Sequence, residues 1–220
     1  MFRVWNHYWF KPECKADAYI GDLVGNCTII RCKPQKHKAY NFFSNEDTHS
    51  IYEQGLDFIL RFGFDLIRGN ILKTTHFGIW SFHHDDERII RGGPPGFWEF
   101  MRGIPANGTI LQSITSELDK GYIVKRIQFN TLLHSYKANL NQLYFGSECL
   151  PLLACREIQV YGKTNGHFSK SKAPIVHPPR NLAMLKYFWL CIYRKIKFHI
   201  HDLFRQEDWK VGYCNCSLEN

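Results

Sequence analysis

The order of elements along the chain predicts a three-layer α/β domain with a Rossmann-like arrangement. Short apolar runs bounded by glycine or polar residues indicate buried strands, and they alternate with patterns typical of helices. A chain of 220 residues is long enough for a sizeable core. Its 45% hydrophobic and 22% charged residues are ordinary values for a folded protein. We therefore expect one main globular domain with a smaller C-terminal part.

Turn residues and apolar runs define the individual elements. The run 56–62 ends at Gly63 and the run 77–83 ends at a polar loop, so each is predicted to be a buried strand. Pro94 and Pro95 follow two glycines and suit a helix start, because proline is tolerated at the first helical position. The predicted elements are, in order, strands at 27–32, 39–43 and 56–62, a helical turn or two at 65–72, a strand at 77–83, a helix at 97–101, strands at 109–115 and 122–129, and helical residues at 134–158.

The C-terminal part differs in composition from the rest. Residues 159–181 are rich in Gly, Ser, Lys and Pro, which is typical of a linker or a long surface loop. We therefore predict a domain at 1–158, this linker, and an extension at 182–220 that holds a helix and the truncated start of a further domain. The helix, at 182–200, is too charged to span a bilayer. Its mixed basic and aromatic residues suit either packing on the domain or peripheral contact with a membrane.

The charge and the cysteines restrict the partners and the compartment. A net charge of +8 favours an anionic partner, which includes phosphate, nucleotide, nucleic acid and membrane surface. The eight cysteines form no C-x-x-C pair, so neither a zinc ribbon nor a thioredoxin motif is supported. Because the chain begins without a charged-then-apolar signal region, we expect a reducing, cytoplasmic setting.

One predicted strand ends in polar, titratable side chains. Side chains two apart on a strand share a face, so Ser81 and His83 project together while His84 points the other way. Asp119 lies on the predicted turn 116–121, from which a carboxylate can reach back to the same cleft. A hydroxyl, an imidazole and a carboxylate together can move protons around a tetrahedral centre.

The local residues leave three other interpretations open. A hydrolytic Ser-His-Asp triad is disfavoured, since Ser81 lacks the G-x-S-x-G elbow and is only two residues from the histidine. A metal site at 83–86 has suitable residue types, but adjacent side chains on a strand diverge and no H-E-x-x-H spacing is present. The third is a structural histidine beside a solvated charge run at 85–87.

The combined order of motifs over residues 50–130 resembles the N-terminal catalytic domain of the formyltransferase family, which includes methionyl-tRNA, glycinamide-ribonucleotide and sugar formyltransferases. That family has a strand ending in Asn-x-His, a following Arg-Gly, a helix with Pro and Trp, a Gly-x-Thr strand and an Asp-x-Gly turn. Its preceding strand and loop look like residues 56–64. The other matching residues are Ser81-Phe82-His83, Arg91-Gly92, Pro95, Trp98, Gly108-Thr109-Ile110 and Asp119-Lys120-Gly121.

The resemblance implies roles for these residues. His83 would be the general acid/base, Asp119 its carboxylate partner, and Ser81 would stand where the family has Asn. The formyl donor would be 10-formyltetrahydrofolate. The residues implied to bind this donor are Phe62, Gly63, Phe64, Asp119 and Gly121. The residues implied to bind the acceptor are Arg91, Gly92 and Pro95.

The implied activity is formyl transfer to a small-molecule amine, with an amino sugar or nucleotide-linked sugar, and thus a phosphate-bearing acceptor, as the preferred substrate. A nucleic-acid acceptor is disfavoured because 160–220 has no recognisable tRNA-binding domain. The sequence departs from the family in two ways: Ser81 is a shorter donor than Asn, and no first strand with a glycine-rich turn is found. These departures favour an alternative function, an inactive module of the same fold that binds sugar or nucleotide.

Overall fold

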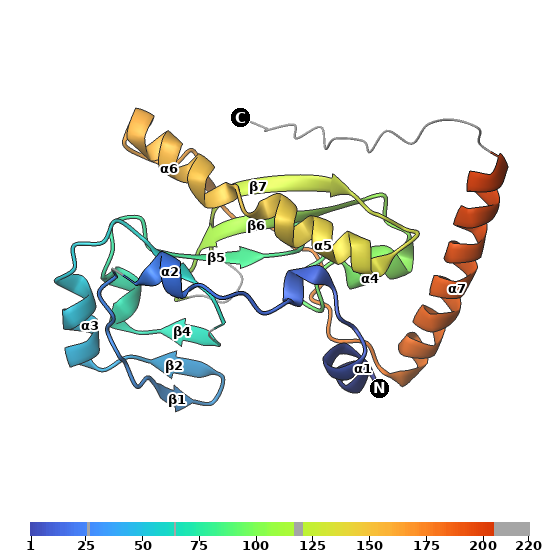
Figure 1. Ribbon diagram of the computed structural model, residues 1–220. Helices are drawn as coiled ribbons and strands as arrows, with labels where there is room; N and C mark the ends of the chain where they lie inside the picture. Colours follow the sequence, from blue (N-terminus) through green and yellow to red (C-terminus); the bar gives the residue numbers. More distant parts are fainter. Residues whose placement is uncertain (26, 64, 117–120, 205–220) are drawn as a thin grey trace.

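The computed structural model describes residues 1–25, 27–63, 65–116 and 121–204, and shows two sheets with helices around them (Figure 1). The larger sheet has five strands in the order β3-β5-β6-β7-β8. Its strands are β3 (Ile59–Arg61), β5 (Ile79–His83), β6 (Ala106–Ser113), β7 (Tyr122–Asn130) and β8 (His167–Phe168). The strands β3 and β5 are parallel, and the other pairs are antiparallel. The prediction of an α/β fold is confirmed.

Two consecutive helices cover one face of the large sheet, α5 (Tyr136–Ser147) and α6 (Leu150–Tyr161). The core between helices and sheet is built on Trp80 and Leu111, which are fully buried against Leu143 and Leu150. The sequence predicted one continuous helical segment here, and the chain instead starts a second helix whose first turn holds Pro151. Proline accounts for the break, because it lacks the N–H that would continue α5 and clashes with a preceding carbonyl.

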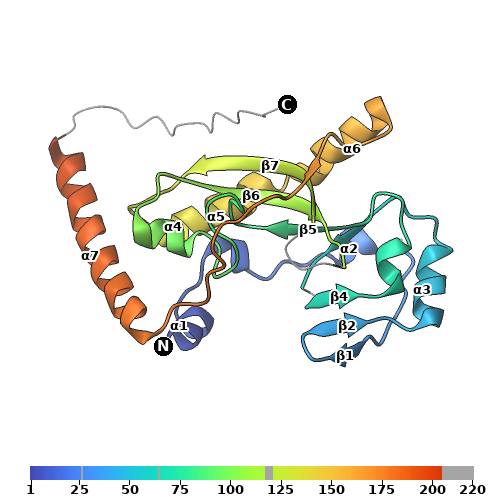
Figure 2. The ribbon, with the colours of Figure 1, turned by 180° about the vertical axis from the view of Figure 1, so that it is seen from behind.

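A smaller sheet in the order β1-β2-β4 lies beside β5 on the other face of the large sheet (Figure 2). Its strands are β1 (Gln35–His37), β2 (Tyr40–Phe42) and β4 (Leu66–Arg68), accompanied by α3 (Asn45–Tyr52) and the 3-10 helix η2 (Asn70–Lys73). Ile67 and Ile71 of this part bury their side chains against Ile79 of β5. Among the described residues, none before Ile59 contributes a strand to the large sheet.

One prediction in this region is wrong and a second holds only in part. Residues 27–32 contain no strand among those described, and the first strand begins at Gln35. The segment 65–72, predicted as helical turns, holds β4 followed by η2. Gly69 separates these two elements with a φ of 96°, a conformation that only glycine adopts readily and that ends the strand before the 3-10 turn.

Four helical segments meet at one end of the large sheet. These are α1 (Phe2–Tyr8), α4 (Phe97–Arg102), α5 and α7 (Asn181–Phe204), while η1 (Glu13–Lys15) and α2 (Gly21–Val24) are short links. Their shared cluster includes Trp5, Phe97, Tyr136 and Tyr187, whose rings pack at centroid distances of 5.0–6.3 Å. The predicted helix at 182–200 is therefore present and packs on the domain.

The segment between α6 and α7 is mostly irregular but is attached to the domain. It supplies β8, and Ile175 forms a parallel bridge with Arg91. The division of the chain at 158 and 181 stays a prediction. In the part of the chain that the structure describes, no helix has the length and apolar character needed to cross a membrane.

Candidate functional site

The site is built by the register of three strands around Ser81. Ser81 of β5 lies opposite Arg61 of β3 on one side and Gln112 of β6 on the other. Residues directly opposite in a sheet share a face, and so do residues two apart on one strand. Arg61, Ser81, His83 and Gln112 therefore project from the same face, the one beside the small sheet.

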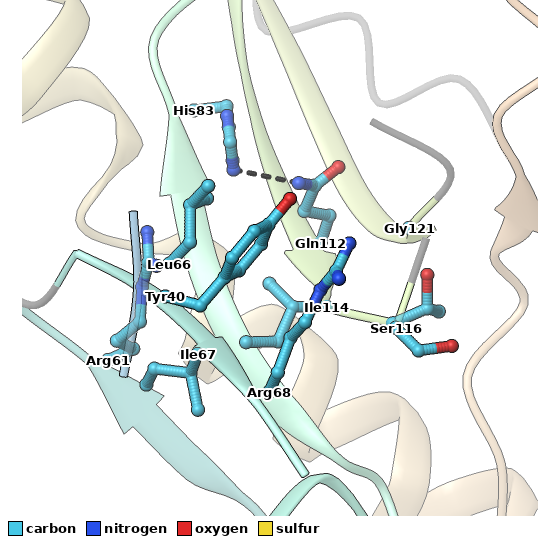
Figure 3. Close-up of a pocket in the computed structure, with 11 residues that line it drawn as sticks. Tyr40, Arg61, Leu66, Ile67, Arg68, His83, Gln112, Ile114, Ser116 and Gly121 are labelled. Carbon is cyan, nitrogen blue, oxygen red and sulfur yellow. Dashed lines mark hydrogen bonds between the residues drawn. The ribbon is translucent and has the colours of Figure 1, made fainter. Parts of the chain in front are cut away.

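His83 and Gln112 contact each other directly on this face (Figure 3). The Nε2 atom of Gln112 lies 2.7 Å from Nε2 of His83. With the carboxamide in this orientation, the amide N–H donates to a ring nitrogen that carries a lone pair, so the ring proton is on Nδ1. The histidine thus presents a basic nitrogen held in place by an amide from the neighbouring strand.

A pocket of about 60 Å³ opens beside this pair, between the two sheets. Tyr40 and Arg68 line it from the small sheet, with the guanidinium 3.7 Å from the ring centroid. Arg61 also lines it, donates to the backbone oxygen of Asp65, and has its pKa lowered by burial, an effect that the Asp65 charge opposes. The other lining residues are Leu66, Ile67, His83, Gln112, Ile114, Thr115, Ser116 and Gly121. The pocket thus combines apolar walls, two arginines and the His83–Gln112 pair.

Ser81 is buried within the sheet. The residue is 2% exposed and does not line the pocket, and among the described residues its hydroxyl contacts the backbone oxygen of Phe82 at 3.5 Å. The side-chain contact described for the histidine is therefore with the carboxamide of Gln112 from β6.

His84 lies on the opposite face of the sheet, as the alternation along the strand predicts. Its ring stacks on Tyr144 of α5 with centroids 3.8 Å apart. Burial lowers the pKa of His84 to about 4, with a further contribution from the nearby His83. This histidine is neutral at neutral pH and serves packing.

The acidic residues after the strand hold the loop together. Asp85 accepts a hydrogen bond from the N–H of Gly92, and Asp86 is 1% exposed while its carboxylate accepts from Arg88 and Gln128. Glu87 pairs with Arg126. The interpretation of 85–87 as a solvated charge run is wrong, because these carboxylates are engaged with named partners and Asp86 is buried.

The three residues assigned to the acceptor lie elsewhere in the fold. Arg91 donates from Nε to the backbone oxygen of Ala173 at 2.9 Å, and Gly92 is bound by Asp85. Pro95 accepts from the hydroxyl of Tyr136 at 3.0 Å. None of the three lines the pocket beside His83, so their acceptor role stays a prediction.

The residues assigned to the donor are only partly placed. Gly121 lines the pocket, and a Cβ there would come within 2.8 Å of the Ser113 backbone oxygen and 3.0 Å of Gln112. Position 121 thus needs a glycine because the backbone packs closely against β6. Phe62 is 67% exposed and Gly63 has a φ of 68°; neither lines the pocket. Phe64 and Asp119 lie outside the described residues.

The pocket residues missed from the sequence include three with polar or charged side chains: Tyr40, Arg68 and Gln112. Gln112 left a weak signal, a large polar side chain in a predicted strand that also contains Ile110, Leu111 and Ile114. Tyr40 and Arg68 left none, because their place depends on how the small sheet packs beside the large one.

Solved structures resemble this chain to different degrees. A variant of HypX from Aquifex aeolicus matches with a TM-score of 0.52 and 15% identity over 68% of this chain and 28% of that one. Methionyl-tRNA formyltransferase from Clostridium thermocellum matches with a TM-score of 0.45 and 16% identity over 62% of this chain and 59% of that one. The N-formyltransferase from Helicobacter canadensis was solved with folinic acid and dTDP-3-aminofucose. It matches with a TM-score of 0.40 and 14% identity over 54% of this chain and 44% of that one.

No protein-family model matches the chain, and no curated protein matches it by sequence. The chain spans about 28% of the length of HypX. Identities this low define the fold alone. The matches to HypX, with TM-scores above 0.5, show that the chain has a formyltransferase-type fold.

Proposed function

We propose that this chain transfers a formyl group from 10-formyltetrahydrofolate to the amine of a small acceptor, an amino sugar or nucleotide-linked sugar. The observation that carries the proposal is the His83–Gln112 pair at a pocket between the two sheets of a formyltransferase fold. A basic nitrogen next to an amide donor is what acyl transfer requires at its reacting centre.

At about 60 Å³ the pocket would hold only part of a reduced folate, and its residue types suit such a ligand. Leu66, Ile67 and Ile114 offer apolar contacts to a flat heterocycle. Arg61 and Arg68 are cations at the same pocket, suited to a carboxylate or phosphate. The donor would supply the formyl carbon and accept a proton on the nitrogen that it leaves. The overall exchange is balanced: the amine loses one proton and gains the formyl group, and the donor nitrogen gains that proton.

In this mechanism His83 handles the proton. Its Nε2 lone pair accepts a hydrogen bond from Gln112, and this bond must break before Nε2 accepts the proton of the attacking amine and returns it to the leaving nitrogen. Asp119, which the resemblance implies as the partner of this histidine, lies outside the described residues and keeps its role as a proposal.

In this mechanism Gln112 supplies the carboxamide that the family places at the position of Ser81. A carboxamide nitrogen has two N–H donors, and in Gln112 only one donates to His83. The second is available for the negative charge that develops on the formyl oxygen. Because Gln112 lies directly opposite Ser81 in the sheet, it delivers a carboxamide to the same face from the adjacent strand.

A second candidate function is an inactive module of the same fold that binds sugar or nucleotide. It is favoured by the burial of Ser81, which removes the only hydroxyl that β5 places on the site face. The two functions differ in turnover, so an assay separates them.

The decisive assay measures formyl transfer from 10-formyltetrahydrofolate to a panel of amino sugars and nucleotide-linked amino sugars. We expect His83→Ala to lower kcat by about 10²–10⁴ through loss of the acid/base. Gln112→Leu should lower kcat by about 10²–10³, as expected for the loss of an oxyanion donor. Ser81→Ala should cost less than about tenfold, because a buried hydroxyl donates little to the oxyanion.

Gln54→Leu is the matched control, the same chemical change on an exposed side chain that does not line the pocket. Turnover that survives His83→Ala would overturn the mechanism. Folate binding without any turnover in the wild type would identify the inactive module. If Ser81→Asn then restored turnover, Gln112 would not be the substitute proposed here.

A further inference from the structure

The helix α7 presents two different faces. Its inner face packs on the domain: Met184 is fully buried, Tyr187 is 5% exposed, and Arg194 donates to the backbone oxygen of Phe100. Phe198 stacks on His134 nearer the other end. The helix lies at the outer edge of the molecule in both views (Figures 1 and 2).

The outer face of α7 is apolar and exposed. Its large side chains follow one another at helical spacing, three or four residues apart, and each leaves between 49% and 65% of its surface in solvent. They are Leu185, Trp189, Ile192, Tyr193, Ile196 and Ile200, and we refer to them as the outer stripe. A contiguous exposed stripe of this size marks a surface that contacts something else.

Lysines border the outer stripe on both sides. At 100° per residue, Lys186 and Lys197 fall on one flank of the stripe and Lys195 falls on the other. All three are exposed, and residues 181–200 contain no Asp or Glu. Long lysine side chains can lay their carbon stems along an apolar surface while the ammonium stays at a polar layer.

This pattern of apolar and basic residues distinguishes between two candidate partners for the outer stripe, a second copy of α7 and an anionic bilayer. A second copy of α7 packed face to face would bring lysine rows together with no carboxylates on 181–200 to balance them. An anionic bilayer offers acyl chains for the stripe and phosphates for the lysines. Trp189 and Tyr193 also suit the boundary between acyl chains and headgroups, where amphipathic rings are enriched.

We propose that the outer stripe docks α7 flat on the surface of an anionic phospholipid bilayer and so holds the formyltransferase-fold domain at the membrane. The inner face of the helix remains packed on the domain, so docking requires no unfolding. This binding is independent of the formyl transfer proposed above, since no residue of the stripe lines the pocket of His83.

The test is co-sedimentation of the purified full chain with vesicles of phosphatidylcholine alone or with about 30 mol% phosphatidylglycerol. We expect binding to the anionic vesicles and its loss as the ionic strength approaches about 1 M. Leu185→Gln, Trp189→Gln and Ile192→Gln combined should lower the partition coefficient by at least about 100-fold. Lys186→Gln, Lys195→Gln and Lys197→Gln combined should lower it by about 100-fold.

Two matched controls keep this test interpretable. Leu152→Gln, Val160→Gln and Tyr161→Gln make a comparable change on the exposed surface of α6, and Lys163→Gln, Lys170→Gln and Lys172→Gln remove the same charge from the 159–181 segment. Both controls should bind as the wild type does, and circular dichroism should confirm that every variant is folded.

The proposal is overturned if the wild type ignores anionic vesicles, or if the control variants lose as much binding as the stripe and lysine variants. It is also overturned if sedimentation equilibrium finds a dimer that the stripe variant alone converts to monomer without any vesicle binding. In that case a second copy is the occupant of the stripe.

Discussion

At the scale of single residues, two adjacent histidines meet opposite environments. His83 faces the pocket and is held by Gln112, while His84 stacks on Tyr144 among apolar side chains. Alternation along β5 decides which histidine faces which side. The alternation of side chains therefore places His83 at the pocket and its neighbour His84 in the core.

The buried His84 makes stability depend on pH. Its pKa falls from 6.5 to about 4 on folding, so the unfolded chain binds the extra proton between these values. Stability is therefore lost as pH falls from about 6.5 towards 4, by at most about 3 kcal/mol from this residue. Urea denaturation at pH 7 and pH 4.5 should show a smaller loss in His84→Phe, which keeps a ring against Tyr144. The exposed His177→Phe should lose as much as the wild type, and an equal loss in all three would contradict the assignment.

At the scale of elements, one glycine lets the start of α4 approach α5 closely. Gly96 precedes α4 with a φ of 62°, and a Cβ there would lie 2.7 Å from the Asn139 amide nitrogen and 2.8 Å from Leu143 of α5. Gly162 ends α6 with a similar φ of 68° but has no atom within 4 Å of such a Cβ. Substitutions at Gly96 and Gly162 therefore separate the cost of backbone strain from the cost of close packing.

We expect Gly96→Ala to lower the free energy of unfolding by about 2–4 kcal/mol, the sum of left-handed strain and overpacking. Gly162→Ala carries the strain alone and should cost about 1–2 kcal/mol. Chemical denaturation of both variants measures the difference. Equal losses would mean that α4 and α5 shift apart without cost and that Gly96 is needed only for its backbone conformation.

At the scale of the whole molecule, the two ends of the described chain are joined through one cluster. Trp5 of α1 and Tyr187 of α7 pack together and against rings from α4 and α5. The boundary predicted at 182 therefore separates segments that share a core.

Met184→Ala tests whether this shared cluster contributes to the free energy of unfolding of the domain. Met184 is fully buried, so its truncation should cost about 2–5 kcal/mol in a single unfolding transition. Leu182→Ala, on a side chain 80% exposed two residues away, should change stability by less than about 0.5 kcal/mol. If Met184→Ala leaves the main transition unmoved, α7 unfolds separately and the predicted division of the chain stands.

The sequence by itself determined the α/β class, the order of most strands and helices, and the face on which His83 lies. These follow from local periodicity, since alternation and apolar runs are properties of neighbouring residues. The same local rules failed at 27–32 and in part at 65–72, where short segments take their structure from the sheet they join and from the conformation of Gly69.

Only the tertiary structure decided what stands next to His83. Gln112 reaches it through the pairing of β5 with β6, and Arg68 reaches the pocket because the small sheet packs beside the large one. Register and sheet packing depend on contacts between residues far apart in the chain, which local periodicity does not encode. The histidine could therefore be found from the sequence, whereas its amide partner could be found only in the fold.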